Sequence, residues 1–184
     1  MPRLMLLITC LLAGVQLAGQ SLRLSPTDIS LEFQVYPTGF LPGIRIDQNF
    51  GKHHALHLRG GLNLINHRDL GVQDDERGSG YGGTFGYRYY FPSDFQGWFL
   101  GLRADVWRNT IEWKNFSDLP GAGTTRLWVL QPTLEGGYLF LLANQTWFIS
   151  PSLGFGVEVN VVTEGAETGQ GLILLLGCSS GIRF

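Results

Sequence analysis

The final stretch of the sequence, 169–184, alternates between two kinds of residue, and this alternation limits what the chain can form. Counting back from Phe184 in steps of two gives a mostly apolar row, and counting back from Arg183 gives a row with more small residues. A period of two residues is typical of a β-strand whose faces contact different surroundings. The ending therefore predicts a strand with an apolar medium on one side and a tighter, more polar space on the other.

The N-terminal stretch 1–19 has the composition of a secretory signal peptide. Arg3 supplies a positive charge, an apolar segment runs from Leu4 to Leu17, and Ala18 and Gly19 are small enough for a cleavage site. This segment is too short for a membrane-spanning helix and has the wrong flanks. We therefore expect a signal peptide over 1–19, removed on export, and one domain over 20–184.

Composition excludes several classes of protein. Without Arg3, the 13 basic residues become 12 against 15 acidic residues, a net charge near −3 with no basic patch for nucleic acid. Cys178 loses its only possible partner when Cys10 leaves with the signal, so no disulfide framework is expected. No other apolar run approaches the ~20 residues of a membrane helix. A spanning protein of this composition would therefore be a closed β-barrel.

The rest of the chain divides into segments with the same alternation of apolar and polar residues. We expect eight strands, at about 28–36, 43–50, 54–66, 80–91, 98–113, 126–141, 146–161 and 169–184. The alternation blurs after Trp107, which predicts a bulge or a strand end there. The pattern predicts an all-β fold, an eight-stranded antiparallel up-and-down transmembrane β-barrel.

The predicted connections fall into two groups. Those between strands two and three, four and five, and six and seven are short, whereas the others tend to be longer or richer in Gly, Pro and acidic residues, as in 37–42, 69–79, 117–125 and 163–168. Outer-membrane barrels have short periplasmic turns and longer external loops, so the short group is predicted to be periplasmic.

Aromatic residues cluster beside the short connections and at the C-terminus. They are Phe50, Tyr89, Phe91, Trp98, Phe140, Trp147 and Phe184. Such a set would form an aromatic girdle at one membrane interface. Tyr36, Trp113, Phe116 and Trp128 are predicted near the opposite rim.

The row opposite the apolar one carries five acidic residues and five arginines. They are Glu32, Arg45, Asp47, Arg59, Arg88, Arg103, Asp105, Glu135, Glu158 and Arg183. If the apolar row contacts lipid, these charges lie inside the barrel, where burial is costly unless they are paired. An eight-stranded barrel is just wide enough for its own side chains. We therefore favour a structural polar plug over the alternative of a proton or ion path, or a gate.

These features resemble the small eight-stranded outer-membrane barrels of Gram-negative bacteria, of the OmpX kind and the OmpA transmembrane domain. The glycine-rich segment 81–91 and the ending 181–184 are similar to small barrels of Bacteroidetes. The resemblance implies location in the cell outer membrane, contact with its lipid and lipopolysaccharide, and no cofactor. It also implies insertion by the barrel-assembly machinery, with Phe184 as the assembly signal.

No set of residues points to catalysis. His67, Glu112 and Ser117 lie near the predicted outer rim, where a lipid-modifying enzyme would need them, but nothing in the sequence ties them together. We expect a protein that is not an enzyme and that has a structural or surface-interaction role, with the external loops as the contact surface for an unknown ligand. The alternatives are a narrow pore for ions or small solutes and an outer-membrane lipid-modifying enzyme.

Metal sites are not expected either. His53 and His54 are adjacent in a strand and would point to opposite faces. The acidic loop residues 74–76, Glu164 and Glu167 have oxygens that suit Ca²⁺ or Mg²⁺, but 74–76 lacks the ligand spacing of a calcium loop. We interpret them as solvated loop charges.

Overall fold

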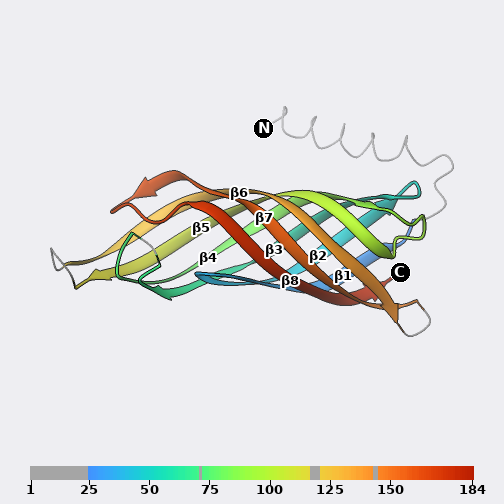
Figure 1. Ribbon diagram of the computed structural model, residues 1–184, viewed down its shortest axis with the longest axis horizontal. Coiled ribbons are helices and arrows are strands. Elements are labelled where there is room, and N and C mark those ends of the chain that lie inside the picture. Colours follow the sequence, from blue (N-terminus) through green and yellow to red (C-terminus); the bar gives the residue numbers. More distant parts are fainter. Residues whose placement is uncertain (1–24, 71, 117–120, 143–144) are drawn as a thin grey trace, which may run out of the picture.

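The computed structural model describes residues 25–70, 72–116, 121–142 and 145–184. Eight antiparallel strands form a closed barrel in chain order, and the last strand pairs with the first (Figure 1). The strands are β1 (Thr27–Tyr36), β2 (Gly39–Phe50), β3 (His54–Arg68), β4 (Asp75–Tyr90), β5 (Gly97–Asn115), β6 (Gly121–Leu142), β7 (Trp147–Glu164) and β8 (Gly171–Arg183). The predicted all-β, eight-stranded antiparallel up-and-down barrel is confirmed. No helix in the described ranges is long and apolar enough to cross a membrane.

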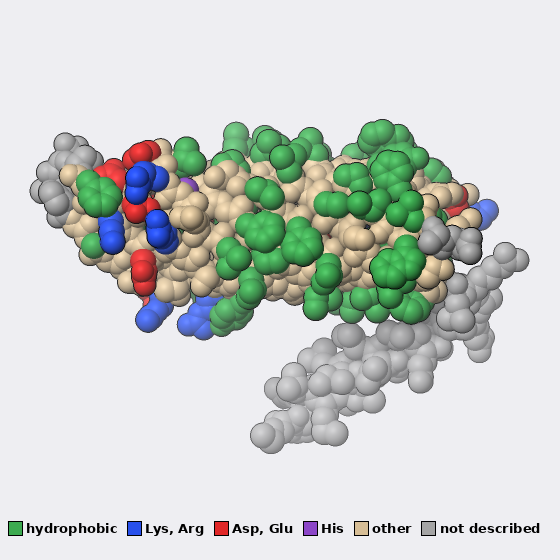
Figure 2. Space-filling view, turned by 90° about the horizontal axis from the view of Figure 1, so that it is seen from below, with side chains coloured by type: hydrophobic (Ala, Val, Ile, Leu, Met, Phe, Trp, Pro, Cys, Tyr) green, Lys and Arg blue, Asp and Glu red, His purple; other side chains and the backbone are tan. Residues whose placement is uncertain are grey.

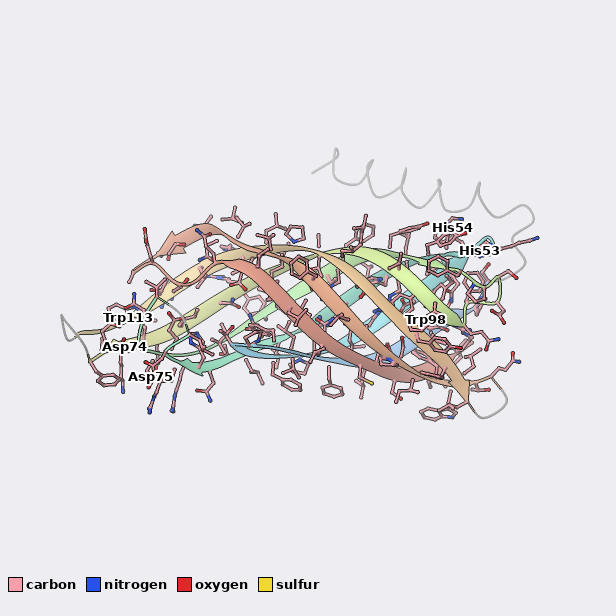
Figure 3. All side chains as sticks on the ribbon, viewed as in Figure 1. His53, His54, Asp74, Asp75, Trp98 and Trp113 are labelled. Carbon is pink, nitrogen blue, oxygen red and sulfur yellow. The ribbon has the colours of Figure 1, made fainter. Side chains whose placement is uncertain are left out.

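The barrel has two different ends. The turn end, at the right of Figure 1, holds the C-terminus and the connections β2–β3, β4–β5 and β6–β7. The loop end, at the left, holds the connections β1–β2, β3–β4, β5–β6 and β7–β8. Figure 3 places His53, His54 and Trp98 at the turn end, and Asp74, Asp75 and Trp113 at the loop end.

Strands extend further toward the loop end than the sequence predicts. The predicted loop 69–79 is partly strand, because β4 begins at Asp75, directly opposite Arg68 at the end of β3. β6 likewise begins at Gly121 within the predicted loop 117–125. These segments are polar, so the alternation that marks a lipid-facing strand is absent, although the backbone ladder continues.

The predicted break 37–42 is also mostly strand, since β2 begins at Gly39 and only Pro37 and Thr38 connect it to β1. Pro42 is accommodated because the β2–β3 ladder skips from Phe40 to Gly43. A proline has no N–H to donate, so it lies where a ladder bond is missing.

The predicted bulge or strand end after Trp107 is wrong. β5 pairs without interruption with both neighbours, and the register shift lies in the β6–β7 ladder, where Trp128 is opposite Val162 and Val129 is opposite Asn160, so that Val161 of β7 is skipped. The alternation blurs because the polarity of the two faces changes: Trp107 and Ile111 are buried in the lumen, whereas Arg108 is exposed outside. The polarity of the side chains therefore changes after Trp107, but the backbone ladder continues.

Apolar side chains cover the outer wall. Figure 2 shows them over most of the visible face, with charged side chains gathered toward the loop end. Leu58 and Leu102, in the middle of their strands, are each 63% exposed. So large an exposed apolar surface on a barrel is the outer surface that a lipid bilayer requires.

Aromatic rings contact one another at the turn end, as expected of a girdle. The ring centroid of Tyr138 lies 5.2 Å from that of Trp98 and 4.4 Å from that of Phe140. Tyr36 and Trp113 lie toward the opposite rim as predicted, but Tyr36 faces the lumen and Trp113 donates a hydrogen bond to Thr125 Oγ1 on the inner side. Strand parity puts both on the inner row.

The lumen is filled in layers along the barrel. A turn-end apolar layer comprises Ala55, Tyr90, Phe95, Phe99, Leu139 and Phe148. A loop-end apolar layer comprises Tyr36, Leu41, Ile65, Trp107, Ile111, Leu127, Val129, Ile173 and Leu175. Charged residues occupy the space between them, as the inward row of β5 shows: Phe99 comes first, Arg103 and Asp105 follow, and Trp107 comes last.

Candidate functional site

Eight of the ten inward-facing residues predicted from the sequence lie together in the lumen. This central charge cluster comprises Glu32, Arg45, Asp47, Arg59, Arg88, Arg103, Asp105 and Glu135. They belong to β1 through β6, so charges far apart in the sequence meet inside the closed barrel. None of these side chains is more than 5% exposed.

Arg103 joins most of the cluster. Its Nε donates to Asp105 Oδ2 at 2.8 Å and its Nη1 donates to Glu32 Oε1 at 3.2 Å. The Nη1 atom also lies 3.9 Å from Glu135 Oε2. One guanidinium therefore contacts carboxylates on β1, β5 and β6, which cross-links non-adjacent strands through the lumen.

The other arginines complete the pairing. Arg45 Nε donates to Asp47 Oδ2 at 2.8 Å, and Arg45 Nη1 donates to Glu32 Oε2 at 3.1 Å. Arg88 binds Glu135 with two bonds, of 2.6 Å and 3.2 Å. Both carboxylate oxygens of Glu135 thus accept from one guanidinium, the bidentate geometry that suits arginine.

Arg59 lies further from its carboxylate neighbours than the other arginines do, and it is held mainly by neutral groups. Its Nη1 lies 3.8 Å from Glu32 and 3.7 Å from Asp105, while its Nη2 donates to the carbonyl of Leu41 at 2.6 Å. The guanidinium also lies 5.5 Å from the ring centroid of Trp107, in a cation–π contact. Arg59 therefore joins the charged layer to the loop-end apolar layer.

The charges of the cluster cancel, since it holds four arginines and four carboxylates. An unpaired charge buried in the lumen would destabilise the fold through lost hydration, so the arrangement depends on this balance of charges. Close approach also requires small neighbours. A Cβ on Gly101 would lie 3.0 Å from Glu135 Cγ, and one on Gly86 would overlap the His57 ring.

Two of the predicted residues lie outside the cluster. Arg183 pairs with Asp28 through bonds of 2.7 Å and donates to the carbonyl of Phe95 at 2.9 Å, at the turn end. Glu158 accepts from Gln131 Nε2 at 2.8 Å and lines a pocket of about 250 Å³ at the loop end. The sequence places Glu158 correctly on the inner face but gives it no arginine partner.

Several polar inner residues that contact the charges were not predicted as site residues. Asp28 holds Arg183, Gln34 bridges Arg59, Arg103 and Glu32, and Thr84 donates to Asp105. Strand parity would have found Asp28 and Gln34, since both share the inner row of Glu32. The uncharged members carry no signal that separates them from other polar lumen residues.

His57 is the least satisfied residue in the lumen. Its side chain is buried, and neither ring nitrogen has a hydrogen-bond partner among the described residues. The Nε atom of Arg59 is also unpaired there. The charged lumen thus combines tightly paired ions with a few polar atoms that the described side chains leave unsatisfied.

The candidate catalytic residues are not brought together. His67 is buried and its Nε2 lies 3.1 Å from Glu76, whereas Glu112 is exposed on the outer face of the wall. Ser117 lies outside the described residues. No group of three or more His, Cys, Asp or Glu in the described ranges could hold a metal ion.

The acidic loop residues also separate. Glu76 points into the barrel, while Asp75 lies 4.0 Å from Arg68 and 3.9 Å from Arg77 on the outer side. Asp74 accepts from the backbone N–H of Phe116 at 2.7 Å. The predicted reading of 74–76 as solvated loop charges is therefore wrong for Glu76.

No protein-family model and no curated protein matches the sequence. Among solved structures, the chain is similar to the N-terminal β-barrel domain of Pseudomonas aeruginosa OprF, with 17% identity, a TM-score of 0.45, and 87% of this chain and 98% of that chain covered. It is also similar to Ail, the attachment invasion locus protein of Yersinia pestis, with 8% identity, a TM-score of 0.46 and coverage of 86% and 95%. Neisserial surface protein A matches with 10% identity, a TM-score of 0.41 and coverage of 86% and 93%. Likenesses this distant carry no inference about what the chain binds or does.

Proposed function

We propose that this protein is an outer-membrane β-barrel with a closed, charge-paired lumen and a structural or surface-interaction role. The observation that carries the proposal is the inverted distribution of polarity. The wall exposes leucine, valine and phenylalanine to the outside, whereas the central charge cluster is buried inside. A soluble protein would face its charges to water, so this arrangement favours lipid around the barrel.

The lengths of the strands support a membrane location. A barrel strand needs about 9–11 residues to cross a bilayer. β1 has 10 residues, whereas β6 has 22, so the longer strands would project beyond the bilayer at the loop end. Because outer-membrane barrels have short periplasmic turns and longer external loops, these lengths support a turn end in the periplasm and a loop end outside the cell.

The contents of the lumen support a closed barrel. The central charge cluster lies between the two apolar layers, and Phe95 belongs to the turn-end layer, where its carbonyl accepts a hydrogen bond from Arg183. Phe95 adopts a φ of 55°, a left-handed conformation that is uncommon for a bulky residue. The turn therefore contains a strained backbone conformation at Phe95. The Phe95 ring packs inside the barrel against Tyr90.

The loop end is suited to contact other molecules because its segments are tied to one another. Gln73 donates to the carbonyl of Glu167 at 3.1 Å and accepts from Asn115 at 2.6 Å. Thr125 donates to the carbonyl of Ala166 at 3.0 Å. A rim held in this way is ordered before it meets a partner, which reduces the entropy lost on binding.

Cell fractionation tests the proposed location. We expect the protein in the outer-membrane fraction, after removal of 1–19, and a change in gel mobility between heated and unheated samples because a folded barrel resists detergent. The comparison uses a known periplasmic protein and a known outer-membrane protein as markers. Recovery of the folded protein with the periplasmic marker contradicts the proposal.

A further inference from the structure

The outer wall of the barrel has a pocket of about 520 Å³ near the loop end. It forms where the outward rows of β3, β4 and β5 contain short side chains between longer ones. Ser79 on β4 lies between Leu64 on β3 and Thr110 on β5 in the ladders. Because Ser79 and Thr110 are small, the longer neighbours around them enclose a hollow.

The two sides of this wall pocket differ in polarity. Leu62 and Leu64 line one side, are 51% and 42% exposed, and continue the apolar surface of the wall. Arg108 and Arg126 line the other side. The pocket therefore lies at the border between the apolar surface and the charged loop end.

Arg108 and Arg126 are diagonal neighbours across β5 and β6, because Thr110 is opposite Arg126 and Arg108 is opposite Trp128. Like charges on neighbouring strands repel each other. Neither arginine has an ion-pair partner within 4.0 Å in the described part of the chain, although Glu164 is opposite Arg126 in the ladder. The exposed Arg68 and Arg77, in contrast, lie near Asp75.

The guanidinium of Arg108 is oriented by its neighbours. Its Nη1 donates to Tyr81 Oη at 3.4 Å, and its Cζ lies 5.8 Å from the ring centroid of Trp128. These contacts hold the group without neutralising its charge. An anion in the pocket would remove the repulsion between the two guanidinium groups.

We propose that the wall pocket binds the phosphate group of a lipid in the outer leaflet. Arg108 and Arg126 contact the phosphate through charge-assisted hydrogen bonds, for which the planar guanidinium is well suited. Leu62 and Leu64 contact the acyl portion. An anionic group beside an apolar chain matches both sides of the pocket, whereas a free phosphate would leave the leucine side empty. This inference rests on the outer-membrane location proposed above.

Native mass spectrometry of the full mature protein, folded in detergent, tests the inference with bisphosphorylated lipid A as the probe. The test variant is Arg108→Gln with Arg126→Gln. The matched control is Arg68→Gln with Arg77→Gln, which removes the same charge from the same end of the barrel. We expect the test variant to bind lipid A at least about tenfold more weakly than wild type, a loss of about 1.4 kcal/mol. The control should bind like wild type.

Two further probes identify what is recognised. Dephosphorylated lipid A should bind wild type and the test variant equally weakly, and inorganic phosphate should not displace bound lipid A. Equal lipid A binding by wild type and test variant, equal losses in both variants, or displacement by inorganic phosphate would overturn the inference. Heat-dependent gel mobility shows whether each variant is folded. If the test variant folds and binds lipid A like wild type, only the lipid site is contradicted. Recovery of the protein in the periplasm contradicts the location.

Discussion

Glu135 shows how one side chain can stabilise several strands. It lies on β6, accepts two hydrogen bonds from Arg88 on β4, and has Arg103 of β5 at 3.9 Å. Arg88 in turn lies 4.1 Å from the ring centroid of Phe99, in the turn-end apolar layer. The carboxylate therefore stabilises two buried arginines and the packing beneath them.

Glu135→Gln should destabilise the folded barrel. The glutamine keeps the size of the side chain but leaves the arginines with one negative charge too few. Breaking a buried pair in this way costs about 3–5 kcal/mol. Urea unfolding of the protein in detergent or vesicles should show a clearly lower midpoint than wild type.

Two variants control this measurement. Glu164→Gln, at the exposed end of β7, should leave the midpoint almost unchanged, because surface charges contribute little. Adding Arg88→Gln to Glu135→Gln should recover part of the lost stability by restoring the charge balance. A Glu135→Gln protein as stable as wild type would show that the cluster is not a network of mutually required charges.

At the scale of the elements, the ladder between β8 and β1 closes the barrel. Phe184 extends it, since its N–H donates to the carbonyl of Thr27 at 2.9 Å and its carbonyl accepts from Thr27 at 3.1 Å. Its side chain is 70% exposed at the turn end. Phe184 thus combines a closing backbone position with a ring at the predicted periplasmic interface.

Phe184→Ser should lower the amount of folded protein in the outer membrane strongly. The serine keeps the backbone bonds but removes the aromatic ring that the assembly machinery is proposed to recognise. Quantitative immunoblots of membrane fractions measure the effect. Phe116→Ser is the control, since Phe116 is similarly exposed but lies at the loop end outside the strands. Equal levels of the two variants would argue against Phe184 as an assembly signal.

The sequence predicts the strands well where one face meets an apolar surface and the other a polar lumen. All eight strands and the inward direction of Arg103 and Glu135 follow from parity alone. The prediction fails near the loop end, where β4 already begins at Asp75. There both faces are polar, so the period of two residues disappears although the ladder persists.

The partner of an inward-facing side chain is harder to predict than the direction in which the side chain points. Parity shows that Glu158 points inward, but it cannot show that its partner is Gln131 and not an arginine. Pairing depends on the stagger between strands, which alternation does not reveal. The apolar layers are also hard to predict, because Trp107 and Phe99 are apolar residues on the inner row of Arg103, where the alternation predicts polar side chains.

At the scale of the whole molecule, the layers in the lumen predict that the barrel does not conduct. An ion would have to pass both apolar layers and displace paired charges between them. Folded protein added to planar lipid bilayers should therefore give no steady current steps, compared with detergent alone as the blank and a porin as the positive control. Reproducible steps from the wild-type protein would favour a narrow pore in place of a closed lumen.

The ladder between β1 and β8 also sets an order in which the molecule can form. The other ladders join strands that are adjacent in the sequence, whereas Asp28 and Arg183 are separated by 155 residues. Bringing distant segments together costs loop-closure entropy, and non-local pairing slows folding. Hairpins can therefore form first, as an open sheet with two unpaired edges, and the cylinder closes last. Until that step, the arginines and carboxylates of the inner face remain hydrated. Their ion pairs therefore replace the hydrating water in the same step in which the barrel closes.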